Sequence, residues 1–564
     1  MKKISLVLIF LALILSQGAA LDINDPSDNL YRDLEYWQEL GFYRHLPEVR
    51  PYSAQLILSL LERVMIKDHS VQRQLALSYY EQINRGLRLD GELELTSGAG
   101  REGIAETTGS ANFMIRGMID EKVSVWGEVS ANGIVEQEEV DYYMYDPSVP
   151  YGDRSESNVV DDISEVGGVA LLQASTGMFS YGTENLYANI GVSRSSFGPY
   201  WGDSVVISSE ASSQGHMELT WRKDHFSYTM LLLELVGTDY YGEGSFSEKY
   251  MALHSYNWAP FDWLDVGFFE SVVWGERLEP LYLMPFTYFF YNQGMAGFDD
   301  NSLMGLKYRI LTENRVEFNG ILYVDDIGFN ELIEADFDTK IKIAFETGAS
   351  WTPARSWLDK INLDYTAVFP YMYTHGLQSD YEDGYEAGDT DGDGDVDYDD
   401  LYDMNCTNYS HNGENLGVTL SPNSDRISLS TRWRATPKTQ FIFRSNWIRH
   451  GNASSENVDG DYDTTDGSLW DNGFSLSGWP DFASEFEFLT QDVLEKVLQF
   501  GVDMETSVAL PFHVREDQVA LDVGMGYTFE RIWNSGRNSS NGYSPEEGDD
   551  ELNHYFYLNT KLAY

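Results

Sequence analysis

From residue 87 onward, apolar and polar residues alternate along the chain with a period of two. Leu87, Leu89, Leu93 and Leu95 alternate with charged or polar neighbours. The same alternation returns in residues 123–131, 186–192, 441–447, 521–529 and 556–564. A period of two places successive side chains on opposite faces of a strand. In the longest runs, of about ten residues, one face is mostly apolar and the other carries charges and amides, which is the pattern of transmembrane β-strands between lipid and a polar lumen.

A large soluble β-sandwich or propeller also alternates, but three features favour a membrane barrel. Whole strands carry full charges on the polar face, the runs are long, and the chain ends on a strand that finishes with Tyr564. A terminal aromatic strand resembles the signal by which bacterial outer-membrane barrels are recognised for assembly. Residues 87–564, at roughly 25 to 28 residues per strand and connection, predict about 18 antiparallel strands. We therefore expect an all-β transmembrane barrel in a bacterial outer membrane.

Residues before the barrel follow a helical period instead. Leu30, Leu34 and Trp37 recur at helical spacing in a first helix, which we expect to begin at Ser27 and to end at Gly41. Two further helices are predicted at 52–67 and 70–84, with their apolar faces formed by Leu56, Leu60, Leu61 and Val64, and by Val71, Leu75, Tyr79 and Ile83. Three short amphipathic helices are marginal alone, so residues 21–86 are predicted to pack as a small bundle on something larger.

The first twenty residues have the features of an export signal. Lys2 and Lys3 precede an apolar run at 4–15, and the small residues at 18–20 form a cleavage site. The apolar run is shorter than the roughly 20 residues that a membrane-spanning helix needs. Because no cysteine follows this run, a lipoprotein anchor is not expected. Residues 1–20 are therefore predicted to be a signal peptide.

Composition narrows the class of partner. The chain has 91 acidic and 37 basic residues and a formal net charge of −54, which makes nucleic acid a poor partner and is typical of a well-solvated exterior. Its single cysteine, Cys406, excludes a disulfide within the chain. Aromatic residues make up 14% of the chain, enough to supply interfacial girdles around a barrel surrounded by outer-membrane lipid. We also expect a monomer.

Five short segments, in their order along the chain, resemble the Wzi capsule-assembly family. They are Tyr31-Arg32-Asp33-Leu34, Arg50-Pro51-Tyr52-Ser53, Gly191-Val192-Ser193-Arg194, Phe197-Gly198-Pro199-Tyr200-Trp201-Gly202 and Gly320-Ile321-Leu322-Tyr323-Val324-Asp325-Asp326. The resemblance implies an outer-membrane barrel plugged at its periplasmic end by the helical bundle. It also implies a non-enzymatic role in attaching or organising capsular polysaccharide. The sequence departs from the family in its acidic charge and in an insertion at 378–415.

That insertion contains an acidic loop with the spacing of a calcium site. Acidic residues stand at positions 1, 3, 5 and 12 of the template, glycine at 6 and an aliphatic residue at 8. Position 12 is Asp where Glu is usual, which resembles dockerin-type loops and predicts weaker binding. The alternative is a solvated loop in an acidic protein. The expected Ca²⁺ ligands are Asp389, Asp391, Asp393, Asp395 (through its backbone carbonyl) and Asp400.

Other chemistry-bearing residues favour structural explanations. We interpret Asp325-Asp326 as turn residues rather than an acid–base pair, and Trp201 as an interfacial residue rather than a sugar platform. His254 and His450 are expected in the lumen or at the membrane interface. Polar stretches at 137–165, 378–415, 451–478 and 534–551 are expected to be extracellular loops. No phosphate-binding glycine loop, zinc-binding histidine pair or nucleophile-elbow serine occurs, so we do not expect an enzyme.

Two functions remain open from the sequence. The first is binding or organising capsular or other surface polysaccharide, for which the resemblance and the loops rich in Tyr, Trp and Asn speak. The second is a passive porin for small solutes, because any wide barrel with a polar lumen could conduct. The position of the helical segment distinguishes them, since a plugged lumen fits binding and an open one fits transport.

Overall fold

The structure is a computed structural model. It describes residues 21–68, 71–101, 105–135, 149–152, 164–165, 170–198, 203–238, 246–275, 277–296, 300–327, 341–353, 358–375, 406–436, 438–451, 488–514, 517–536 and 545–563. The predicted signal peptide at 1–20 and the calcium loop at 389–400 lie outside these residues.

Within the described residues, eighteen long strands form one closed antiparallel barrel, as the sequence predicted. Each strand pairs with the next along the chain, and the first pairs with the last from Glu92↔Ala563 to Ala99↔Phe556. This closure leaves no strand edge open to lipid, as a membrane barrel requires. The strands are β2 (Arg88–Ala99), β3 (Ala105–Met118), β4 (Val123–Val135), β6 (Ala170–Gly182), β7 (Leu186–Ser193), β9 (Gln214–Lys223), β10 (Phe226–Gly237), β11 (Phe246–Phe261), β12 (Leu264–Gly275), β13 (Asn301–Leu311), β14 (Val316–Ile327), β15 (Ile341–Trp351), β16 (Leu358–Val368), β19 (Ser424–Thr436), β20 (Thr439–His450), β21 (Glu495–Val514), β22 (Asp517–Trp533) and β23 (Glu551–Ala563).

Short turns and long connections alternate along the chain, so they collect at opposite ends of the barrel. Residues 183–185, 224–225, 262–263 and 312–315 turn at one end, where β2 begins and β23 finishes. The connections at the other end are mostly much longer. Since the short turns of such barrels are periplasmic, the long connections lie on the extracellular side.

The outward face of the wall is apolar, as the alternation predicted. Leu89, Val129, Ile190, Phe443 and Leu558 are all exposed on the outside. Near the short turns, the exposed aromatic side chains are Trp221, Trp258, Phe261, Trp263 and Trp351. They form a girdle of the kind that marks the membrane interface.

Two details of the wall differ from the prediction. Asp325 and Asp326 are not in a turn: they belong to β14, at an irregularity in its pairing with β15 after Val324. In addition, Leu231, Leu233 and Leu235 on β10 point into the lumen and are buried there. The polar-lumen rule fails on this strand because other parts of the chain fill the lumen beside it.

The N-terminal segment forms three helices close to those predicted: α2 (Asn29–Glu39), α3 (Ala54–Lys67) and α4 (Val71–Ile83). Asp28, rather than Ser27, caps α2 and accepts from the Leu30 amide at 2.7 Å. Gly41 follows the end of the helix with φ 80°, a conformation that glycine adopts without strain. Val71 is exposed and not on a core face, because α4 packs mainly on α3.

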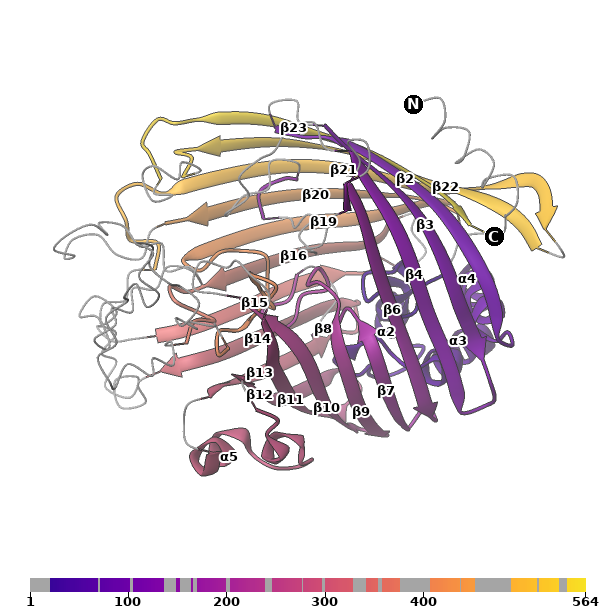
Figure 1. Cartoon of the computed structure of the whole chain (residues 1–564), viewed down its shortest axis with the longest axis horizontal. Helices are drawn as coiled ribbons and strands as arrows, with labels where there is room; N and C mark the ends of the chain where they lie inside the picture. Colours follow the sequence, from indigo (N-terminus) through magenta and orange to yellow (C-terminus); the bar gives the residue numbers. More distant parts are fainter. Residues whose placement is uncertain are drawn as a thin grey trace, which may run out of the picture.

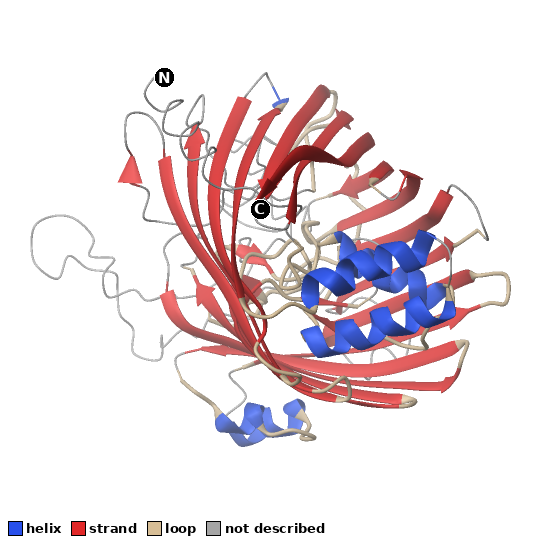
Figure 2. Ribbon diagram, turned by 90° about the vertical axis from the view of Figure 1, so that its right-hand side faces the viewer, coloured by secondary structure: helices blue, strands red, loops and turns tan. Residues whose placement is uncertain are grey.

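These helices lie in the periplasmic end of the barrel. Figure 1 shows α2, α3 and α4 enclosed by the first strands, and Figure 2 shows them filling the mouth of the barrel. A fourth described helix, α5 (Phe289–Ala296), lies outside the wall in both views. No helix in the described ranges is long and apolar enough to cross a bilayer.

Candidate functional site

The candidate site is the lumen, which the chain's own residues occupy. We call residues 21–67 the plug. At several contacts the plug presents an acidic side chain and the wall a basic one. Asp33 on α2 pairs with Arg434 at 2.5 Å and with Arg432 at 3.1 Å, both on β19. Glu39 and Glu48 pair with Lys360 on β16 and Lys307 on β13. A chain poor in basic residues thus places several of them where they hold the plug.

Other wall residues bind the plug backbone. Arg116 on β3 donates to the Leu21 carbonyl at 2.7 Å, and Arg222 on β9 donates to the His45 carbonyl at 2.9 Å. Asn29 donates to Glu505 on β21 at 2.9 Å. The plug therefore contacts strands all around the barrel, which fixes its position more firmly than contact with one side would.

Three of the five segments that carried the family resemblance contact one another, through Tyr31, Tyr52, Arg50 and Gly198. Arg50 donates to the Gly198 carbonyl at 2.9 Å and forms an ion pair with Glu35. The Tyr52 amide donates to the Tyr31 hydroxyl at 3.0 Å. Segments more than a hundred residues apart in sequence are thus brought to one junction.

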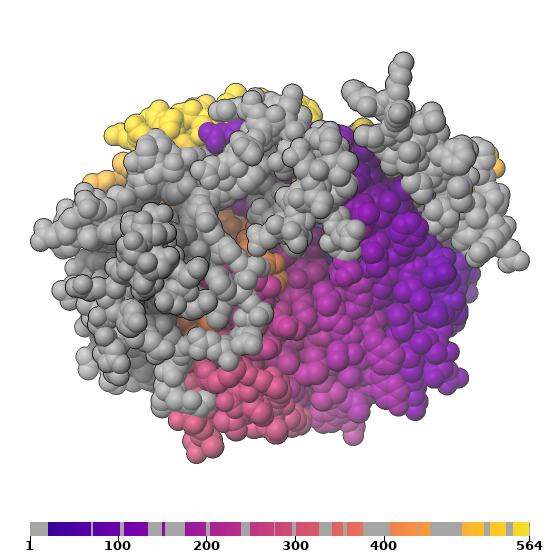
Figure 3. Space-filling model, viewed as in Figure 1, coloured from indigo at the N-terminus to yellow at the C-terminus, as the bar shows by residue number. Residues whose placement is uncertain are grey.

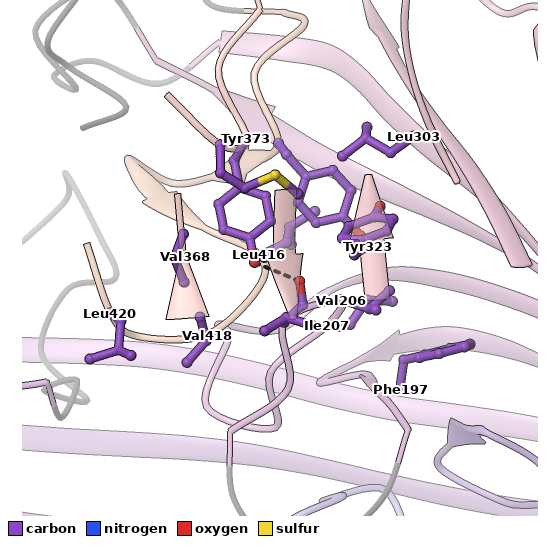
Figure 4. Packing of buried hydrophobic residues seen from close by; sticks show 14 of the residues in the cluster. Phe197, Val206, Ile207, Leu303, Tyr323, Val368, Tyr373, Leu416, Val418 and Leu420 are labelled. Carbon is purple, nitrogen blue, oxygen red and sulfur yellow. Dashed lines mark hydrogen bonds between the residues drawn. The ribbon is translucent and has the colours of Figure 1, made fainter. Parts of the chain in front are cut away.

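A second layer closes the extracellular half of the lumen. We call residues 203–213, 369–375 and 406–423 the cap. Tyr373 donates to the Val205 carbonyl at 2.6 Å, and the Thr419 amide donates to Asp203 at 2.5 Å. Figure 4 shows apolar side chains of the cap packed against one another and against side chains of the wall. The buried residues of this cluster include Tyr323 and Val368 of the wall and, from the cap, Val205, Val206, Ile207, Met372, Tyr373, Tyr409, Leu416, Val418 and Leu420.

Plug and cap are joined inside the barrel. The short strand β1 (Val49–Arg50) of the plug pairs with β8 (Ser196–Phe197), which leads into the cap. Val49 and Phe197 both belong to the apolar core beneath the cap. The cap is tied to the wall as well, since Lys249 on β11 donates to Ser410 at 2.9 Å and Lys342 on β15 donates to the Thr374 carbonyl at 2.6 Å. The described residues thus form one continuous filling from the periplasmic end into the extracellular half.

A small polar cavity remains between the plug and the wall strands β12 to β14. Its volume is about 60 Å³, and Glu35, Glu39, Arg50, Asp265 and Lys307 are among the residues that line it. That volume holds a few water molecules. We interpret the cavity as a solvated part of the plug interface.

Burial raises the pKa values of carboxyl groups in the plug, and neighbouring arginines lower them. Burial raises the pKa of Asp28 to about 7, and burial raises that of Glu35 to about 7 despite the Arg50 guanidinium. Asp33 differs: burial opposes its ionisation, but Arg434 and Arg432 together hold the pKa below its usual value. Asp33 is therefore the charged anchor of the plug, and Asp28 and Glu35 titrate near neutral pH.

The predicted metal ligands Asp389, Asp391, Asp393, Asp395 and Asp400 all lie outside the described residues, as does Trp201. Among the residues that are described, no group of three or more His, Cys, Asp and Glu side chains could hold a metal ion. Cys406 is buried and forms no disulfide. His254 lies on the outer wall, where it is covered by a chain segment.

Sequence reasoning found the plug but not what holds it. Arg432, Arg434, Lys360 and Lys307 each stand on the polar face of an alternating strand, and nothing local separates them from other luminal residues. The sequence feature that could have identified these four residues is that basic residues are rare in this chain. In a chain with 37 basic and 91 acidic residues, a basic side chain facing the lumen implies an acidic partner there.

Comparison with known proteins supports the fold of this chain and does not establish its function. No protein-family model matches the sequence, and no curated protein matches it. The structure is similar to that of Wzi from Escherichia coli, an outer-membrane protein involved in group 1 capsule assembly and described as a carbohydrate-binding β-barrel. The two share 13% identity with a TM-score of 0.53, over 96% of this chain and 99% of that one.

Weaker matches are barrels of the OprD type. Pseudomonas aeruginosa OprD has a TM-score of 0.42 and 9% identity over 85% of this chain and 97% of its own. Acinetobacter baumannii OccAB2 has a TM-score of 0.40 at the same identity and coverage. The chain therefore has the fold of an 18-strand outer-membrane barrel, consistent with a bacterial outer membrane, and the similarity to Wzi noted in its sequence extends over almost the whole structure.

Proposed function

We propose that this protein binds or organises capsular or other surface polysaccharide at the extracellular face of the outer membrane, in support of capsule assembly, and that it is not an enzyme. The observation that carries the proposal is the filled lumen. A plug and a cap occupy the interior of this barrel, and they fill the space through which a porin passes solutes. Its function then belongs to the surface formed by its long connections.

The similarity to Wzi supports the same proposal, because the structure described as a carbohydrate-binding barrel covers 96% of this chain. The polar stretches at 137–165 and 378–415 contain four and five Tyr residues, and the stretch at 451–478 contains Trp470. Aromatic faces and amide groups bind sugars without requiring charge of either sign. An acidic exterior therefore does not prevent binding of a neutral polysaccharide.

Conductance in planar bilayers tests the proposal against the porin alternative. We expect the intact protein to give no stable current, because plug and cap both fill the lumen. A large, stable current from the intact protein would favour a passive porin. The matched control is Arg531→Ala, which removes an exposed ion pair with Asp550 on the extracellular side and leaves the plug untouched.

Binding to a panel of purified neutral and acidic bacterial polysaccharides tests the positive half of the proposal. The intact protein in proteoliposomes should retain at least one of these polymers, and addition of the free polymer should release it. Failure to retain any polymer, with the barrel folded and non-conducting, would contradict polysaccharide binding while leaving the plugged lumen in place.

We further propose that the acidic loop at 389–400 binds Ca²⁺ and stiffens the longest extracellular connection. The support is the spacing of Asp389, Asp391, Asp393, Asp395 and Asp400 around Gly394. Calorimetry should record calcium binding to the intact protein in the millimolar range and none to Asp389→Ala. Equal heats from the two proteins would end this proposal, and Asp262→Ala, in a short periplasmic turn, is the control.

A further inference from the structure

The connection between β12 and β13 does not project from the barrel as the other long connections are expected to. Its residues 277–296, which we call the strap, contain the short 3-10 helix η2 (Pro280–Leu283) and α5. Figures 1 and 2 show α5 against the outer side of the wall. Tyr282 and Phe289 of the strap pack on Ala252, Val272 and Trp274. These three wall residues alternate with the luminal Leu253 and Val273, so the strap covers the outward face.

The strap conceals a polar pair on that face. His254 on β11 and Glu270 on β12 are directly opposite each other, with Nδ1 and Oε1 3.4 Å apart. The Phe289 amide donates to Glu270 at 2.9 Å, and the Phe289 ring stacks on His254 at 4.1 Å. Both side chains are almost fully buried. Charged groups on the lipid face of a barrel are destabilising, and the strap separates this pair from whatever surrounds the wall.

The height of the pair places the strap beside the membrane. Glu270 is six residues from Leu264, where β12 begins at the periplasmic turn. Six residues at about 3.3 Å each span about 20 Å along the strand, and a tilt of about 40° reduces the height to roughly 15 Å, within an apolar band about 25 Å tall. A segment bound at this height lies next to the lipid and not above it.

The exposed side of the strap is itself apolar. From residue 280 to 296 the sequence has no Asp, Glu, Lys, Arg or His, although 128 of the 564 residues are Asp, Glu, Lys or Arg. A described connection at the same end, 545–550, contains four acidic residues in six. Figure 3 shows the strap as the rose-coloured bulge at the lower edge of the molecule. Its exposed side chains are Leu278, Met284, Phe286, Tyr288, Phe290, Tyr291 and Met295.

We propose that the strap is a membrane-interface segment, with its exposed side chains among the acyl chains and headgroups of the outer leaflet. The partner is a lipid surface. Apolar and tyrosine side chains without charge are the composition that such interfaces favour. The strap continues the apolar belt, since Leu306 on the neighbouring β13 is exposed on the same outer face. In this sector of the barrel, the wall is two layers thick and lipid meets the strap.

Spin-label accessibility in proteoliposomes tests the proposal on the full chain. Labels are placed at Tyr291 and Met295 in a Cys406→Ser background, with Leu306 as the lipid-facing control and Asp550 as the water-facing control. Collisions with oxygen should match those at Leu306, and collisions with a water-soluble nickel complex should be several-fold rarer than at Asp550. Nickel accessibility equal to that at Asp550 would overturn the proposal. Labels shielded from both reagents, with broadening between labels, would instead identify a contact with a second copy and overturn it too.

A measurement on the unsubstituted protein guards against misfolding of the labelled forms. Hydroxyl-radical oxidation in proteoliposomes should be slow at Met295 and as slow as at Met525, which is exposed on the outward face of β22. Transfer of the protein to detergent should not increase the oxidation rate of Met295 without also increasing that of Met525. Rapid oxidation of Met295 in the bilayer, with Met525 protected, would mean that the strap lies in water.

Discussion

Removing the carboxylate of Asp33 should loosen the plug without unfolding the barrel. Asp33 is about 2% exposed and lies between Arg434 and Arg432 at 2.5 and 3.1 Å, and the Tyr79 hydroxyl donates to it at 3.0 Å. Breaking a buried ion pair from one side costs about 3–5 kcal/mol, because it leaves the partner charge unpaired. In Asp33→Ala, Asp359 still pairs with Arg432 at 3.3 Å and with Arg434 at 2.9 Å. We therefore expect a loss of about 3 kcal/mol in the stability of the docked plug.

Hydrogen exchange measures this loss directly. A change of about 3 kcal/mol raises the population of the open plug roughly a hundredfold, since every 1.4 kcal/mol is about tenfold. Amides of α2 should then exchange faster by about that factor, while amides of β19 keep their protection. Unchanged exchange in α2 would refute the reasoning. The double variant Asp33→Ala with Arg434→Ala should recover part of the loss, because it removes an unpaired charge.

Three further changes test separate features of the filling. Because the pKa of Asp28 in the folded protein, about 7, exceeds the usual aspartate value of 3.8, the folded state binds the proton more tightly and the plug should weaken as pH rises. Between about pH 5.5 and about pH 8 the loss is on the order of 2 kcal/mol. Hydrogen exchange should show a smaller loss in Asp28→Asn, which keeps the helix cap. In Gly117→Ala the new Cβ would lie 2.6 Å from the Gly86 carbonyl oxygen at φ 139°, so urea unfolding should show a loss of about 1–3 kcal/mol. Tyr373→Phe removes the hydrogen bond to Val205 and should cost about 1 kcal/mol, measured as faster exchange in the cap.

Each of these changes has a matched control. Glu81→Gln removes an exposed carboxylate of α4 and should leave the pH dependence unchanged. Gly548→Ala introduces a side chain at φ 85° where nothing lies within 4 Å, which separates backbone strain from the collision expected at Gly117. Tyr308→Phe removes an exposed hydroxyl and should not affect the cap. If the pH dependence changed equally in Glu81→Gln and Asp28→Asn, its assignment to Asp28 would be wrong. If exchange in the cap changed equally in Tyr308→Phe and Tyr373→Phe, its assignment to the Tyr373 hydroxyl would be wrong.

The periodic parts of the fold were predictable because each is set by local sequence. Alternation between Leu89 and its neighbours defines a strand and its outward face, and the spacing of Leu30, Leu34 and Trp37 defines a helix and its buried face. The prediction failed where contacts are remote. The luminal Leu231 is buried because the cap reaches it from far along the chain. The sequence near β10 does not indicate that contact.

The strap shows the same limit from the other side of the wall. His254 and Glu270 lie on the outward face of their strands, and the alternation rule alone would expose them to lipid. The rule and the residues are compatible only if a third segment covers them, and Phe289 does so. A polar residue at an outward position of a barrel strand therefore carries information about a connection elsewhere in the chain. In this protein, the strand that carries the outward-facing carboxylate is followed by a long connection whose residues 280–296 carry no charge, and this segment covers the carboxylate.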